Sequence, residues 1–278
     1  MEWLTENKIP IGKWAKYVVD WLTDNAAFVF EGLETVLEVI ISVILTIFQY
    51  PPAFVVIAIV CVLAWWSKRS VPLVVAVAVG MLFIVNQGYW EETTETLTLV
   101  LASAIVCMAI GVPIGIFLAH NPRAFAFARP VLDLMQTLPT FVYLIPAIIF
   151  FGLGMVPGLV ATVIFVIPAP IRLTQLGISS TPKDMIEAGK AFGASSQQLL
   201  WKVELPSALP QIMAGLTQTI MLSLSMVVIA ALVGADGLGV PIVRALNTVN
   251  TALGFEAGFV IVVVAILLDR LLRVGERT

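Results

Sequence analysis

Few side chains in this sequence have the types and spacing that catalytic chemistry requires. Its two cysteines, Cys61 and Cys107, both lie in apolar runs, at a spacing that fits no metal site. The single histidine, His120, stands beside Asn121 and Pro122, where we expect a loop residue and not a catalytic base. These residues therefore predict neither a metal centre nor a nucleophile with its base.

One acid, Asp133, has a position that suggests a function. It lies about one helical turn inside an apolar run, in the segment LDLMQTLPT. An acid at membrane depth is a functional candidate by default. The alternative is a structural role near the end of the run, with the carboxylate either hydrated or paired with Arg129 four residues earlier.

The elements that position these residues are expected to be membrane helices. Hydrophobic residues make up 60% and charged residues 12% of the 278 residues, whereas about a quarter of a soluble domain is charged. A spanning helix needs about 20 apolar residues. The sequence thus predicts an all-α integral membrane protein, a polytopic helical bundle of about seven, or with one further segment eight, transmembrane helices. The seven expected spans cover 53–66, 71–87, 96–119, 130–154, 156–174, 210–234 and 255–272.

The N-terminal part, 1–50, is expected to be an arm, and 51–278 the transmembrane domain. Within the arm, 11–22 has apolar residues at helical spacing with charged residues between them, which predicts an amphipathic helix in the membrane interface. A solvated arm docked on its own protein is the equal alternative. The apolar segment 32–48 contains two glutamates, and we leave open whether it spans, with preference for the surface. The apolar residues of 11–22 are Ile11, Trp14, Val18 and Trp21.

Lysine and arginine gather in alternate loops, which predicts the orientation of the chain. They occur at 67–70, after 119, between 174 and 210 and in the C-terminal tail, whereas 49–52, 88–96 and 234–254 are poor in them. The insert between 174 and 210 and the C-terminus are therefore expected in the cytoplasm. With seven spans the N-terminus faces outward, and with eight it faces inward.

Prolines fall inside several expected spans, and each tends to kink its helix. Membrane helices tolerate such kinks where neighbours or water satisfy the freed backbone groups. Kinked helices around a common axis suit a transport pathway, although they also occur in membrane proteins without one. The prolines are Pro113, Pro139, Pro146, Pro168 and Pro170.

A polar insert interrupts the apolar pattern, and its first half predicts a short helix. Thr181 can cap a helix that has Pro182 at its first position and extends to about Phe192. Gly193 then permits a reversal of the chain without Cβ strain.

The second half of the insert predicts another helix. Ser195, with Gln198 three residues later, forms the pattern of a capping box, and Leu205-Pro206 is expected to end this helix. Residues 180–206 are thus expected to form a compact unit, the knob. A rigid knob on a membrane domain suits docking to a cytoplasmic partner, and a helical hairpin without a special role is the alternative.

The knob carries a recognisable motif. Glu187-Ala188-Gly189 is followed after three residues by Gly193, and later by Val203-Glu204-Leu205-Pro206. This spacing resembles the EAA loop of binding-protein-dependent ABC importers, with Gly189 in place of the second alanine and Val203 in place of isoleucine. The glycine weakens the helix by about 1 kcal/mol relative to alanine.

The resemblance extends over essentially the whole chain, to permease subunits of importers for glycine betaine and proline. The segments that carry it are IPIGKW, LDLMQTLPTFVYLIPA, IRLTQLGI and LSLSMVVIAALVGADGLG. It implies the type I ABC importer permease fold, a cytoplasmic coupling loop at 175–209 and an N-terminus outside the cell. The residues that it implies for ATPase coupling are Glu187, Ala188, Gly189, Gly193, Leu205 and Pro206.

The chain has no G-x-x-x-x-G-K-[ST] phosphate loop, so we expect it to bind no cofactor, with ATP and Mg on a separate ATPase. The expected partners are two ATPase subunits, a second copy of the chain, an extracytoplasmic binding protein and membrane lipid. No nucleic-acid partner is expected.

Quaternary ammonium groups are commonly bound through cation–π contacts, and aromatic residues lie near Asp133. They can equally be lipid-facing or core residues. The candidate pathway residues are Asp133, Gln136, Thr137, Pro139, Phe141 and Tyr143, with Phe150 and Phe151 as further aromatics.

Two other classes of function compete with an importer subunit. An ion-gradient-driven secondary transporter would use Asp133 as its coupling acid and broken helices around the solute, but it leaves the knob unexplained. A membrane-embedded enzyme would need clustered ligands or acids, which the sequence lacks. The residues leave open whether the solute is betaine, proline, carnitine or choline.

Overall fold

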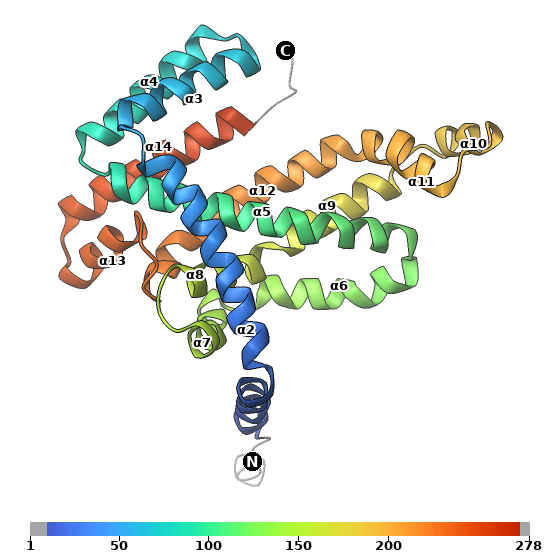
Figure 1. Ribbon diagram of the computed structural model, residues 1–278, viewed down its shortest axis with the longest axis horizontal. Helices are drawn as coiled ribbons and strands as arrows, with labels where there is room; N and C mark the ends of the chain where they lie inside the picture. Colours follow the sequence, from blue (N-terminus) through green and yellow to red (C-terminus); the bar gives the residue numbers. More distant parts are fainter. Residues whose placement is uncertain (1–9, 273–278) are drawn as a thin grey trace, which may run out of the picture.

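The protein is seen in a computed structural model that describes residues 10–272, and over this range it contains helices and no strands (Figure 1). This confirms the all-α prediction. The helices are α2 (Ile11–Gln49), α3 (Ala53–Lys68), α4 (Val71–Asn86), α5 (Trp90–His120), α6 (Pro122–Thr137), α7 (Thr140–Phe151), α8 (Met155–Val166), α9 (Pro168–Ser179), α10 (Lys183–Ala191), α11 (Ser196–Leu199), the π-helical turn η1 (Leu200–Glu204), α12 (Leu205–Ala231), α13 (Gly239–Thr248) and α14 (Thr251–Leu272).

Helices α5, α8, α9 and α12 form the centre of the bundle. Small residues allow their backbones to approach closely: a Cβ atom added at Gly115 would lie 2.6 Å from Cβ of Thr174, and one at Gly177 would lie 3.0 Å from Cβ of Ala208. The buried hydroxyls of Ser103 and Ser223 are hydrogen-bonded across α5 and α12, 2.7 Å apart. Close approach of small residues and interhelical hydrogen bonds are what hold helices together in lipid.

The number of candidate spans is roughly consistent with the expected bundle of about seven. Among the described residues, four helices are long and apolar enough to cross a membrane unaided, and two bent pairs, α2 with α3 and α6 with α7, pass the same test together. Helix α4, with 16 residues, is about 24 Å long and is the shorter apolar helix. The four long helices are Trp90–His120, Met155–Ser179, Ser196–Ala231 and Thr251–Leu272.

The span expected at 130–154 is not one straight helix. Helices α6 and α7 meet at an angle of 93° at Pro139, and Leu138 is extended, with ψ of 138°. A residue before proline prefers this extended conformation, so the break follows from the local sequence. Pro113 has no such effect, because α5 continues through it.

Helix α2 crosses the bundle and does not run along it (Figure 1). Its segment 32–48 packs through Leu37 and Ile41, which are buried in a cluster with Leu159 of α8. Towards the N-terminus the helix is kinked at Ala26. The turns before the kink leave large apolar side chains exposed, and the interfacial helix and the docked arm both stay predictions. These exposed side chains are Trp14, Tyr17, Val18 and Trp21.

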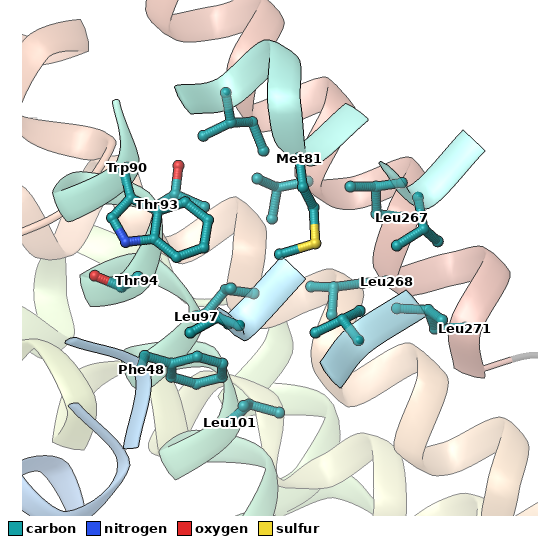
Figure 2. A pocket seen from close by; sticks show the side chains of 15 residues that line it. Phe48, Met81, Trp90, Thr93, Thr94, Leu97, Leu101, Leu267, Leu268 and Leu271 are labelled. Carbon is teal, nitrogen blue, oxygen red and sulfur yellow. The ribbon is translucent and has the colours of Figure 1, made fainter. Parts of the chain in front are cut away.

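Helices α3 and α4 form a hairpin through Arg69, whose backbone is left-handed with φ of +46°. A cavity of about 120 Å³ lies between this hairpin, α5 and α14, and its lining is apolar except for Thr93 and Thr94. Figure 2 shows Met81 and Trp90 among the side chains around it. The hairpin therefore adds a peripheral apolar layer to the bundle.

Candidate functional site

The knob lies at the far end of the molecule, where α9 leads into it and α12 leaves it (Figure 1). It consists of α10, α11 and η1, as two short helical arms joined at Gly193. The predicted helix–break–helix is thereby confirmed, and its details explain the EAA-like spacing.

Helix α10 begins differently from the prediction. Pro182 is the N-cap and makes no side-chain cap, and the buried Oγ1 of Thr181 has no hydrogen-bond partner within the described residues. The prediction that Thr181 caps the helix is therefore wrong. Backbone bonds replace the cap, since the N–H groups of Met185 and Ile186 donate to the carbonyl of Pro182.

Helix α10 ends in the way that the glycine predicts. Gly193 has φ of +77°. Its N–H donates to the carbonyl of Lys190 at 2.9 Å, and the N–H of Ala194 donates to the carbonyl of Gly189 at 3.0 Å. This pair of bonds is a Schellman motif. A Cβ atom at Gly193 would meet nothing within 4 Å, so the left-handed backbone, not a lack of space, calls for glycine.

The second arm begins with the predicted capping box. The N–H of Gln198 donates to Oγ of Ser195 at 3.3 Å, and the N–H of Ser195 donates to Oε1 of Gln198 at 2.9 Å. The two arms then meet at Gly189, where an added Cβ atom would lie 2.5 Å from Cδ2 of Leu199. Glycine at this position, where the family has alanine, therefore permits a closer crossing of the arms.

The helix does not end at Leu205-Pro206, contrary to the prediction. It continues from α11 through η1 into α12, as one apolar helix over Ser196–Ala231. In η1 the N–H of Leu205 donates to the carbonyl of Leu200, five residues earlier. This wide turn, in which hydrogen bonds span five residues, stands just before Pro206, which has no N–H to donate. Proline is thus accommodated at the start of α12 instead of ending the helix.

The surface of the knob is partly apolar. Glu187, Ala188 and Gly193 are exposed. Gly189 is partly buried against Leu199 of the knob, whereas Leu205 is partly buried in a cluster with α5. Pro206 is exposed. Beside them lie large apolar side chains that the sequence analysis missed: Phe192 is 92% exposed and Trp201 is 70% exposed. Aromatic residues inside a polar insert were the available signal, and such exposure is typical of an interaction surface.

Asp133 pairs with Arg172 of α9, not with Arg129. Their Nη2 and Oδ1 atoms are 2.5 Å apart, and both side chains are partly exposed. The pairing joins α6 to α9, 39 residues away in the sequence, which is why it was not foreseen. Nε of Arg172 is buried without a hydrogen-bond partner in the described part of the chain.

The other candidate pathway residues lie in different surroundings. Gln136 is partly buried, whereas Thr137, Pro139 and Phe141 are exposed. Tyr143 is buried, and its hydroxyl donates to the carbonyl of Met135 at 2.7 Å. This bond ties the start of α7 to the end of α6.

The two further aromatics, Phe150 and Phe151, contact an aromatic ring of the arm. The ring of Phe30 in α2 stacks on that of Phe150 with centroids 4.2 Å apart, and it meets Phe151 edge to face. They are packing residues between α2 and α7, as the structural alternative proposed.

His120 is the last residue of α5 and not a loop residue. Its Nε2 lies 2.9 Å from Oε2 of Glu204 in η1, and its Nδ1 lies 2.9 Å from the carbonyl oxygen of Ile116. The fold alone brings the histidine and the glutamate together, because 84 residues separate them.

Comparisons with known proteins agree with this geometry. Residues 111–277 match the family described as binding-protein-dependent transport system inner membrane component. The chain is 46% identical over 265 residues to the glycine betaine transport system permease protein OpuAB of Bacillus subtilis, covering 95% of this chain and 93% of that protein. It is 45% identical to the glycine betaine/carnitine transport permease protein GbuB of Listeria monocytogenes, covering 95% and 94%.

A third relative, the glycine betaine/proline betaine permease protein ProW of Escherichia coli, is 44% identical, covering 95% of this chain and 74% of the relative. Among solved structures, an inward-facing form of the MetNI methionine ABC transporter is similar in fold. Its TM-score is 0.60 at 23% sequence identity, covering 69% of this chain and 96% of that one. Since the match covers most of the chain, the secondary transporter is excluded, and this multi-pass membrane protein belongs to the permease subunits of binding-protein-dependent ABC importers.

Proposed function

We propose that the chain carries glycine betaine or a closely related quaternary amine into the cell as the membrane subunit of an ATP-driven importer. The observation that carries this proposal is the identity of 44–46% over 95% of the chain to permeases named for glycine betaine. Such a solute serves as an osmoprotectant, and its selection would fall mainly to the binding protein.

In this proposal the knob is the part of the chain that receives the movement driven by ATP hydrolysis. A separate ATPase would bind ATP and Mg, while this chain binds neither. The exposed face with Glu187, Ala188 and Gly193 would sit on the ATPase, with Phe192 and Trp201 as its apolar anchors. Buried aromatic residues commonly dominate such interfaces. Gly189 would set the crossing of the two arms, and Leu205 and Pro206 would join the knob to α12.

The assembly would contain two copies of this chain, two ATPase subunits and one binding protein on the outer side. Closure of the ATPase pair would move the two knobs together and rock the bundles between inward-open and outward-open states. The positive loops support a cytoplasmic position of the knob and the C-terminus. With seven spans and a cytoplasmic C-terminus, the N-terminus would lie outside the cell.

The ion pair of Asp133 and Arg172 would line the solute pathway. Helices α8 and α9 form one apolar run of 25 residues, about 37 Å long. Arg172 lies about 10 Å from its knob-side end, and hence within the hydrocarbon depth. A partly exposed ion pair at this depth is too costly to face lipid. A pathway or the second copy must therefore cover it, and its paired charges suit a zwitterionic solute.

The function is tested by reconstitution. The chain, its ATPase and its binding protein are placed in liposomes, and uptake of labelled glycine betaine is followed with and without ATP. We expect uptake that needs all three proteins and ATP, and that an ionophore does not abolish. Uptake by the chain alone, driven by an ion gradient, would contradict the proposal.

A further inference from the structure

Glu204, at the end of η1, is a buried carboxylate in a knob that otherwise leaves its charged residues exposed. It is 8% exposed, and His120 is its hydrogen-bond partner among the described residues. A buried carboxylate is costly unless it is paired. The contact to His120 therefore stabilises the buried carboxylate where η1 meets the end of α5.

The π-helical turn helps to create this arrangement. Trp201 and Lys202 of this turn are exposed, whereas Glu204 points to the end of α5. The extra residue of a π-helical turn permits both orientations within five residues. Leu200 begins the turn and Leu205 follows it, and both pack in a cluster with Ile116 and Ala119 of α5. Such turns occur frequently at functional sites.

Both ring nitrogens of His120 lie within hydrogen-bonding distance of an oxygen atom. A carbonyl oxygen can only accept, so Nδ1 must carry a hydrogen to bond the carbonyl of Ile116. The contact between Nε2 and Oε2 of Glu204 then needs a second proton between the ring and the carboxylate.

The contact also joins parts that the chain does not join directly. The knob continues into α9 and α12, whereas α5 continues into α6 through Asn121. Helix α6 begins two residues after His120 and carries Asp133, the partner of Arg172. A displacement of the knob can thus reach the ion pair through Glu204, His120 and α6.

We propose that His120 and Glu204 are positioning residues that transmit movement of the knob to α5 and α6, and so couple ATP hydrolysis to opening of the pathway. The proposal rests on the function proposed above, in which the knob docks on an ATPase. It assigns to the pair a role in coupling, not in ATPase binding.

The test uses the reconstituted complex and three readouts: recovery of the ATPase with the chain, basal ATP hydrolysis, and solute transported per ATP hydrolysed. We expect His120→Ala and Glu204→Ala to keep the first two while lowering transport per ATP by about tenfold, the equivalent of about 1.4 kcal/mol of coupling. The double variant should be no worse than either single variant, because both remove one contact.

Two further variants separate coupling from folding. Glu204→Gln should restore transport per ATP, because the amide can donate to Nε2 of a neutral ring whose Nδ1 still donates to Ile116. Asn121→Ala is the matched control: its amide bonds the carbonyl of Phe117 at 2.8 Å, also four residues back, but makes no hydrogen bond to η1 in the described residues. It should behave as wild type.

Three results would overturn the inference. Wild-type transport per ATP in both alanine variants would show that the contact carries no coupling. Loss of ATPase recovery in those variants, with Asn121→Ala unaffected, would show that the pair merely shapes the knob. A wild-type complex without ATP-dependent uptake would overturn the proposed function and this inference together.

Discussion

Gly193 is the residue whose backbone sets the turn of the knob, and with it the shape of the proposed docking surface. Its φ of +77° is a conformation that costs most other residues about 1–2 kcal/mol, although the space around it is open. We expect Gly193→Trp to lose the ATPase in co-purification from mild detergent, while Gly193→Asn retains it because asparagine tolerates this conformation. Equal recovery with the tryptophan variant and the wild type would argue against docking at the knob.

Trp201 offers a second test at the same scale, through its side chain. If it is an anchor, Trp201→Ala should cost about 2 kcal/mol of binding, which weakens the affinity of the purified ATPase about 30-fold. Trp66 is the matched control, because it is 79% exposed on α3, far from the knob. If Trp66→Ala weakened binding as much as Trp201→Ala, the effect would not belong to the knob.

At the scale of elements, α9 carries polar residues along one side, at Arg172, Gln175 and Ser179. A row of this kind in an apolar helix is expected to face water or protein and not lipid. In an assembled transporter whose Cys61 and Cys107 are replaced by alanine, Gln175→Cys should react with a membrane-impermeant thiol reagent.

The neighbouring Leu176→Cys is the control for this experiment. Leu176 is 49% exposed but lies about 100° further around the helix, so it should be protected by lipid. Equal labelling at both positions would contradict a pathway on the side of Arg172.

For the whole molecule, the exposed ion pair predicts that one copy is incomplete. The charges of Asp133 and Arg172 lie on the surface of the isolated chain, and a second copy would enclose them. Native mass spectrometry of the detergent-extracted complex should therefore find two copies of this chain with two ATPase subunits. A stable and active complex with a single copy would contradict this assembly.

Much of the candidate site could be predicted from the sequence, because it depends on local rules. The apolar runs, the break at Pro139, the turn at Gly193 and the capping box of Ser195 each rest on a few neighbouring residues, and the structure has all of them. The predicted cap at Thr181 and the helix end at Pro206 are wrong. At the start of α10 the backbone carbonyl of Pro182 accepts the hydrogen bonds that a side-chain cap would otherwise make. At Pro206 the π-helical turn lets the helix continue.

Only the tertiary structure decided the contacts between residues that lie far apart in the sequence. Asp133 meets Arg172 and not Arg129, and His120 meets Glu204, because helices packed through small residues bring distant positions within hydrogen-bonding distance. The sequence by itself determined a membrane bundle with a polar helical knob, since hydrophobicity and turn preferences are properties of short segments. Pairing of charges depends on packing in three dimensions, and no short segment contains it.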